Sequence, residues 1–188
     1  MAKLVSKVYG EALFELALEK QSVDTLFEEV LLVREALAEN KEMIQMLAHP
    51  QIAREEKLSV VETIFRGRVS DDLTGFLLLI VDKGRAGELD AVLGYFLSKV
   101  KEYKKIGVVK VTSAVELSAE QKKSVEEKLL ATTDYATVEM HYKVDAALIG
   151  GLIIRIGDRV VDSSIRTKLQ QLEKQLQKIQ ISEINQTK

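Results

Sequence analysis

The sequence predicts an α+β protein: an N-terminal six-helix bundle over residues 1–105, then a small mixed α/β domain over 106–181 with the order β-α-β-β-β-α, and a polar tail over 182–188. Apolar residues recur at helical spacing through the first part, and at Ile106-Gly107 the period changes to the alternation typical of strands. Later, Gly157-Asp158 separates two alternating apolar runs, which indicates a β-hairpin with a two-residue turn.

The first expected helix spans residues 3–20, and its polar side chains occupy one line along it. That line consists of Lys3, Lys7, Glu11, Glu15 and Glu19. Apolar residues therefore surround most of the circumference, which is more than one core contact requires. The second expected helix, 22–39, is conventional. Its predicted inward residues are Val23, Leu26, Phe27, Val30, Leu31 and Leu37.

Four further helices are expected before residue 105. A short helix over 43–47 ends before the single proline, and a helix over 54–65 is closed by Gly67. The fifth helix begins after the N-cap residue Ser70 and is apolar on all sides, which predicts a central position.

Two glycines have expected roles in this fifth helix, one within it and one at its end. Gly75 would let another backbone approach closely, and Gly84 is the expected C-cap. The sixth helix, 86–103, is predicted to return across the bundle. Its apolar stripe consists of Leu89, Val92, Leu93, Phe96, Val100 and Tyr103.

The C-terminal part alternates strands with two helices. A strand over 108–115 precedes Ser118-Ala-Glu-Gln121, a capping box that opens a helix to about residue 131. A second strand is expected over 138–144, and the hairpin follows. Ser163 or Ser164 can then cap the last helix. The apolar residues of that helix step by four, three, four and three: Ile165, Leu169, Leu172, Leu176 and Ile179. A seam of this kind is typical of a helix that packs on another helix or on a sheet.

Composition limits the protein's class. With 46% hydrophobic and 30% charged residues in 188, the chain can bury a core, and the absence of Cys excludes disulfides and thiolate metal sites. No apolar run approaches the roughly 20 residues of a membrane span, so we expect no direct membrane insertion. Residues 1–104 carry 14 Lys and Arg against 18 Asp and Glu (−4), and residues 105–188 carry 13 against 11 (+2). Neither part has the basic excess that would predict nucleic-acid binding.

The sequence offers little for catalysis. His49 and His141 have no neighbours at metal-ligand spacing, and Asp71 with Asp72 is explained by the helix dipole. Gly150-Gly151 leads into a strand, whereas phosphate-binding loops open helices. We therefore expect no catalytic residue, metal or cofactor. The surplus apolar surface of the first and fifth helices has two explanations that the residues alone leave open: a well-buried bundle, or a site that holds a partner's amphipathic helix.

Several segments resemble one known family, in its order and spacing and over nearly the whole chain. They are Asp82-Lys-Gly-Arg85, Val111-Thr-Ser-Ala-Val-Glu-Leu-Ser118 with Gln121, Val144-Asp145, and Leu148 through Leu172. The family is that of the delta subunit of F-type ATP synthase, which includes the mitochondrial oligomycin-sensitivity-conferring protein. Two positions depart from its pattern: Ala146 stands where proline is frequent, and Ser163 where glycine is usual.

The resemblance implies a non-catalytic stator protein at the cytoplasmic face of a bacterial plasma membrane, held there through the ATP synthase complex. Its six-helix bundle would hold the N-terminal helix of an α subunit of the catalytic head, and its C-terminal domain would contact the b subunits of the peripheral stalk. Carried over by position, the α-facing residues are Tyr9, Ala12, Leu16, Leu79, Asp82 and Lys83. The b-facing residues are Gly151, Arg155, Asp158 and Arg166.

Two other classes stay open at this point. Small helical bundles also occur in RNA-binding antitermination factors, although the −4 charge of the first 104 residues argues against this. A small enzyme is the second class, although the sequence contains no nucleophile-base pair or metal constellation to support it.

Overall fold

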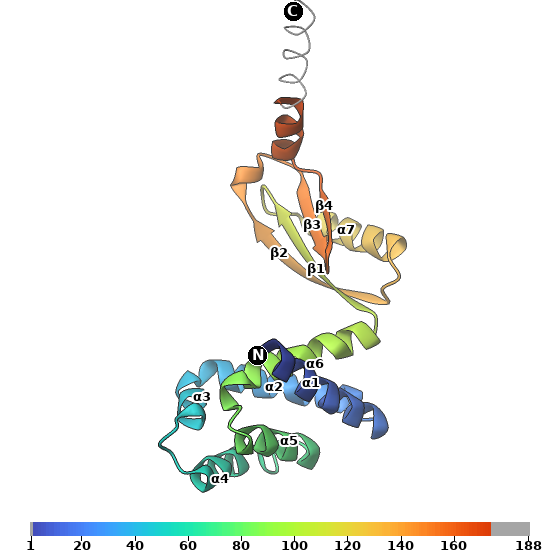
Figure 1. The fold of residues 1–188 in the computed structure, drawn as a ribbon. Coiled ribbons are helices and arrows are strands. Elements are labelled where there is room, and N and C mark those ends of the chain that lie inside the picture. Colours follow the sequence, from blue (N-terminus) through green and yellow to red (C-terminus); the bar gives the residue numbers. More distant parts are fainter. Residues whose placement is uncertain (1, 174–188) are drawn as a thin grey trace, which may run out of the picture. The chain divides into compact units, whose positions relative to one another are not determined.

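The computed structural model describes residues 2–173, and the chain divides into two compact units, Met1–Tyr103 and Lys104–Lys188. The first unit is helical and the second contains a four-stranded mixed sheet (Figure 1). This confirms the predicted α+β class. The seam residues Leu176 and Ile179 and the predicted tail, 182–188, lie outside the described residues.

The N-terminal unit contains six α-helices. They are α1 (Ala2–Glu19), α2 (Val23–Glu39), α3 (Lys41–Ala48), α4 (Arg54–Phe65), α5 (Asp71–Asp82) and α6 (Leu89–Tyr103), with the 3₁₀ turn η1 (Ala86–Glu88) before α6. The third helix is longer than its apolar residues predict. The sixth helix is divided, because its predicted first turn is 3₁₀.

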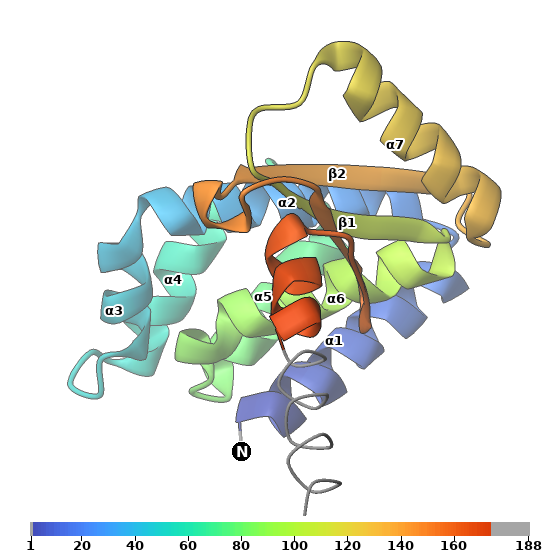
Figure 2. The ribbon, with the colours of Figure 1, turned by 90° about the horizontal axis from the view of Figure 1, so that it is seen from above.

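Helices α1 and α6 lie side by side and pack closely (Figure 1, Figure 2). A Cβ atom added to Gly10 would lie 2.6 Å from the Tyr95 ring, so only glycine allows this approach. The Tyr95 hydroxyl donates a hydrogen bond of 2.9 Å to Glu11. The core formed around α6 includes Leu13, Leu26, Val30, Val33, Leu73, Ile80, Leu93 and Phe96.

Three burial predictions for these helices are wrong. Leu31 is exposed and Val33 takes the inward position on α2. Tyr103, predicted on the buried stripe of α6, is 60% exposed, and its ring meets the edge of Phe14. Helix α5 is apolar but not surrounded, since Gly75 and Leu79 lie on its exposed side. Each sequence pattern marks an apolar side of a helix, and only the neighbouring helices decide which part of it is covered.

The start of α5 is capped as predicted. The Ser70 hydroxyl accepts a hydrogen bond from the Leu73 N–H at 3.4 Å. The end follows the prediction as well: Gly84 adopts a φ of +68°, and the next residue, Arg85, donates its N–H to the Ile80 carbonyl at 3.0 Å. This left-handed residue ends the helix and turns the chain into η1.

The C-terminal unit contains a sheet with the strand order β2-β1-β3-β4. Its elements are β1 (Ile106–Ser113), α7 (Ala119–Thr132), β2 (Thr137–Val144), the 3₁₀ turn η2 (Ala146–Leu148), β3 (Leu152–Ile156), β4 (Arg159–Asp162), and helical residues 165–173. Strand β1 pairs with β2 in parallel across the α7 crossover, and the other pairings are antiparallel.

Helix α7 begins at the predicted capping box and covers one face of the sheet (Figure 1). Leu129 and Val125 pack against Val109 and Val111 of the central strand. The opposite face carries Lys110, which is exposed. A single helix leaves part of the apolar face uncovered: Val144 and Val161, both in register with that face, are exposed.

The last helix is capped by Ser164, which resolves the choice between two serines. The Ser164 hydroxyl accepts from the Thr167 N–H at 3.3 Å, whereas the Ser163 hydroxyl donates to the Leu152 carbonyl. Asp162 strengthens this cap by accepting from the Ser164 N–H at 2.9 Å and from the Thr167 hydroxyl at 2.8 Å.

Candidate protein-binding surfaces

The end of α1 is linked to the start of α5 by an ion pair, and α1 also contacts η1, which follows α5. Near one end, Lys20 Nζ lies 2.5 Å from Asp72 Oδ1 in the first turn of α5. Beyond the other end of α5, η1 packs against α1. Because α6 follows η1 and sets Tyr95 against Gly10, η1 lies toward the start of α1. We use the name α1/α5 surface for the exposed residues Val8 and Ala12 of α1 with Gly75 and Leu79 of α5.

Two of the three predicted α-facing residues of α1, Tyr9 and Leu16, lie on the side of this helix that carries Lys20, the partner of Asp72. Tyr9, Leu16 and Lys20 follow at intervals of seven and four residues, which places them on one side of the helix, and Lys20 meets α5. Tyr9 and Leu16 are half-buried against the core, whereas Ala12 is exposed. The two larger side chains thus have a packing role, and Ala12 is free to meet a partner.

The predicted residues of α5 have unequal surroundings. Leu79 is 46% exposed, which is a large apolar exposure for a helix that is otherwise well packed. Asp82 forms an ion pair with Arg54 of α4, so its carboxylate already has an internal partner. Lys83 is exposed at the C-cap, where its N–H satisfies carbonyls of the last turn.

Two residues of this surface were missed among the predicted contacts. Val8 is exposed on α1, one turn before Ala12. Gly75 lies one turn before Leu79 and has no atom within 4 Å of an added Cβ, so the predicted close approach of another backbone does not occur within the described chain. Because α5 is apolar on all sides, its sequence pattern did not show that Gly75 and Leu79 lie on an exposed side.

The four residues predicted to face the b subunits do not form one cluster on a single face. Arg155 is on β3 opposite Lys110 and Val160, so its register places it on the sheet face away from α7. Asp158 occupies the turn between β3 and β4, and Arg166 is exposed on the last helix.

Gly151 has a backbone role in the structure. Its φ is +80°, and an added Cβ would lie 2.4 Å from the Ser163 carbonyl oxygen. The residue allows the chain to pass close to the start of the last helix, which glycine alone permits.

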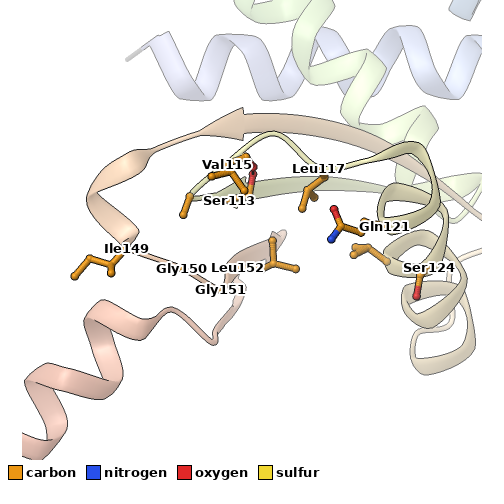
Figure 3. A pocket seen from close by; sticks show the side chains of 11 residues that line it. Ser113, Val115, Leu117, Gln121, Ser124, Ile149, Gly150, Gly151 and Leu152 are labelled. Carbon is orange, nitrogen blue, oxygen red and sulfur yellow. Dashed lines mark hydrogen bonds between the residues drawn. The ribbon is translucent and has the colours of Figure 1, made fainter.

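A cavity of about 390 Å³ opens between α7 and the segment that leads into β3. Figure 3 shows Ile149 at one end of it and Gln121 and Ser124 at the other. The remaining lining is mostly apolar: Ser113, Ala114, Val115, Leu117, Val125, Gly150, Gly151 and Leu152. The sequence showed no sign of this cavity, because its walls come from three separate segments: 113–117, 121–125 and 149–152.

The histidines are engaged at the surface. The His49 ring nitrogen Nδ1 accepts from the Gln51 N–H at 3.3 Å, and His141 Nε2 lies 2.9 Å from a Glu139 oxygen. Among residues 2–173, no group of three or more His, Cys, Asp or Glu could hold a metal ion. Within the same residues, no helix has both the length and the apolarity to cross a membrane.

These features define a class: a two-unit protein whose prominent surfaces are apolar and suited to binding other polypeptides. Comparison with known proteins identifies the family to which this chain belongs. A family model described as ATP synthase delta (OSCP) subunit matches residues 5–176. The chain is 60% identical over 181 residues to ATP synthase subunit delta of Lachnoclostridium phytofermentans. The matched residues make up 96% of this chain and 100% of that relative.

More distant relatives agree. The chloroplastic ATP synthase subunit delta of Emiliania huxleyi is 36% identical over 164 residues, covering 87% of this chain and 91% of its own. A chain in the cryo-EM structure of the Toxoplasma gondii mitochondrial ATP synthase hexamer has the same fold, with a TM-score of 0.73 at 20% identity, over 91% of this chain and 96% of that one. The protein belongs to the ATP synthase delta (OSCP) subunit family, as its sequence motifs predicted. These comparisons give the RNA-binding alternative no support.

Proposed function

We propose that this protein is a non-catalytic stator component of an F-type ATP synthase. It links the N-terminus of an α subunit in the catalytic head to the b subunits of the peripheral stalk. The observation that carries the proposal is 60% identity to an ATP synthase delta subunit over that relative's whole length. By holding the head still, the protein makes the rotating central shaft do work on the catalytic sites, and it needs no chemistry of its own.

The α1/α5 surface suits the N-terminal helix of an α subunit. An amphipathic helix lying there would cover the exposed Ala12, Val8 and Leu79 with its apolar side, in the manner of a helix bound in a groove. The open space at Gly75 leaves room for its side chains. Each aliphatic anchor that becomes buried contributes roughly 1.5 to 3 kcal/mol, so a few anchors outweigh the ordering cost of the partner.

The C-terminal unit supplies the contact with the stalk. Its single covering helix leaves apolar residues of the sheet exposed, and its last helix carries an exposed apolar line of Ile165, Leu169 and Leu172. The two contacts lie on different units of the chain, so each partner has a binding surface of its own. Such a link places it at the cytoplasmic face of a bacterial plasma membrane, held there by the complex alone.

Affinity capture from native membranes tests the whole proposal. A tagged full-length chain, expressed from its own locus and purified in mild detergent, is expected to bring the α, β and b subunits with it. Capture of the chain without head and stalk subunits, or full coupling of proton flow to ATP synthesis in a strain that lacks the chain, would refute the stator role. An unrelated tagged soluble protein is the matched control for non-specific capture.

A further inference from the structure

Strand β2 forms a long outer edge of the sheet. It has eight residues, 137–144, and pairs with β1 along all of them without a bulge. Its other side pairs with no strand among residues 2–173, whereas the opposite edge of the sheet is β4, with only four residues. Proteins usually shorten, bulge or cover such edges, because the unpaired N–H and C=O groups of an edge strand bind other strands. The regular edge of β2 is therefore able to bind a partner strand.

The second half of this edge is exposed. All four side chains from His141 to Val144 are exposed, and the valine is 53% exposed although its register places it on the apolar face of the sheet. Tyr142 is 37% exposed, with its ring beside Lys122 of α7. Helix α7 thus leaves the end of β2 uncovered on the face that it otherwise protects. A partner on this edge gains stability by burying these two apolar side chains.

The charges of β2 are complementary to those of the same strand read in the opposite direction. In an antiparallel pairing of two copies centred on His141, Glu139 of each copy lies opposite Lys143 of the other. A slide of two residues sets Glu139 against Asp145 or His141 instead, and neither register keeps Lys143 opposite a carboxylate. Opposite charges at directly facing positions stabilise a strand pair, and like charges destabilise it. The charges therefore favour one register of a symmetric pair.

The same register pairs the apolar side chains. Val144 faces Val138 of the copy, and Tyr142 faces Met140, all on the face that α7 covers. Val138 and Met140 are half-buried against the core of this unit, so each exposed side chain at one end of the strand meets a packed one at the other. The pairing covers both exposed apolar residues of β2 in each chain. It also joins two four-stranded sheets into one continuous sheet.

We propose that free copies of this chain associate through β2, which pairs antiparallel with β2 of a second copy about His141. This pairing is independent of the stator role, because it concerns the chain outside any complex. It uses neither the α1/α5 surface nor the apolar line of the last helix. A strand edge buries little area, so the dimer is weak and reversible. It shields the edge from unrelated strands while the chain is free.

Sedimentation velocity of the full-length chain at increasing concentration tests the proposal. The wild type is expected to change reversibly from monomer to dimer. Lys143→Glu sets like charges opposite each other at two places in the pair, so it should weaken dimerisation about tenfold or more. Arg159→Glu is the matched control, because Arg159 is an exposed basic residue on the opposite edge strand. This control should leave the dimer unchanged.

A mixing experiment distinguishes the contact from a loss of folding. Glu139→Lys alone and Lys143→Glu alone each face like charges in a dimer, whereas a mixture of the two variants has opposite charges at both places. The mixture is expected to form a heterodimer with nearly the wild-type affinity. The double variant Glu139→Lys/Lys143→Glu should dimerise with itself for the same reason.

Three outcomes would overturn the proposal. The first is a wild-type chain that stays monomeric at every concentration up to about 1 mM. The second is a dimer that Lys143→Glu leaves unchanged, because a surface other than β2 then joins the two copies. The third is a mixture of the two single variants that stays monomeric although each variant has the circular dichroism spectrum of the wild type.

Discussion

Both carboxylate oxygens of Glu29 in α2 accept hydrogen bonds from Ser70, the residue that caps α5. The Ser70 N–H lies 3.0 Å from Oε1 and its hydroxyl 2.6 Å from Oε2. The same hydroxyl accepts from the Leu73 N–H, so one serine joins the cap of α5 to the side chain of another helix. This relationship fixes where α5 starts, and with it the position of the exposed Leu79.

Replacing Glu29 tests this relationship. Glu29→Ala leaves two donors of Ser70 without their partner in a half-buried place, so we expect the free energy of unfolding to fall by about 1 to 3 kcal/mol. Urea denaturation of the full chain measures it. Glu28→Ala removes the exposed neighbouring carboxylate and is expected to change stability by no more than about 0.5 kcal/mol. Equal effects of the two substitutions would show that the Ser70 contact contributes nothing.

Charge on the α1/α5 surface should prevent binding of the α subunit. Ala12→Asp places a carboxylate at an exposed position of α1, where it costs folding little but would be buried by the partner helix. We expect binding of a synthetic α N-terminal peptide to fall about a hundredfold or more, with an unchanged circular dichroism spectrum. Tyr9→Asp should also abolish binding, with some loss of stability because Tyr9 is half-buried.

The control for the peptide experiment is Leu31→Asp. Leu31 is exposed on α2 and lies two residues from Glu29, which puts it on the opposite side of that helix from the contact with Ser70. It should leave peptide affinity unchanged. Normal binding by both Ala12→Asp and Tyr9→Asp would move the α-binding site elsewhere on the protein.

The two positive-φ glycines of the hairpin region should differ in their tolerance of alanine. Gly157 has a φ of +53° with open space around it, so Gly157→Ala should cost about 1 to 2 kcal/mol from conformation alone. Gly151→Ala adds a collision with the Ser163 carbonyl oxygen and should cost distinctly more. Denaturation curves of both variants measure the difference. Equal losses would mean that the chain near Ser163 shifts freely and that Gly151 has no special backbone role.

Asp162 should make the cap of the last helix depend on pH. Hydrogen bonds from the hydroxyl and N–H of Ser164, and then from Thr167, lower the pKa of Asp162 from its ordinary value near 3.8. A carboxyl with a lower pKa in the folded state stabilises the fold above its unfolded pKa, and this contribution disappears as the pH falls through the folded pKa. The stability difference between wild type and Asp162→Asn should therefore be largest near neutral pH and shrink below about pH 4. NMR titration of the Asp162 carboxyl that gave a pKa at or above 3.8 would contradict this.

The local sequence was sufficient for most elements of the fold and for their ends. The Ser118 capping box, the Ser70 cap, the left-handed Gly84 and the Gly157-Asp158 turn are all found where the residues predicted them. Each depends on contacts within a few residues of chain, so short patterns determine it. The family was likewise evident from motifs, because these retain local order and spacing.

The candidate surfaces were harder to predict from the sequence. The family resemblance selected Tyr9, Ala12 and Leu16 on α1 and Leu79 on α5, but the sequence did not show that Tyr9 and Leu16 are half-buried while Ala12 is exposed. The b-facing residues were chosen from a motif that spans both faces of the sheet, and for that reason they did not gather at one place.

The sequence alone determined the order of the elements, the change from helical to alternating period near residue 106, and the family. Only the tertiary structure decided that Leu31 and Tyr103 are exposed, that Gly75 opens onto the surface, and that Ile149 is held at positive φ beside a cavity. The physical reason is the distance along the chain over which each feature is determined. Caps and turns involve neighbours along the chain, whereas burial depends on which segments, distant in sequence, come to lie against each side chain.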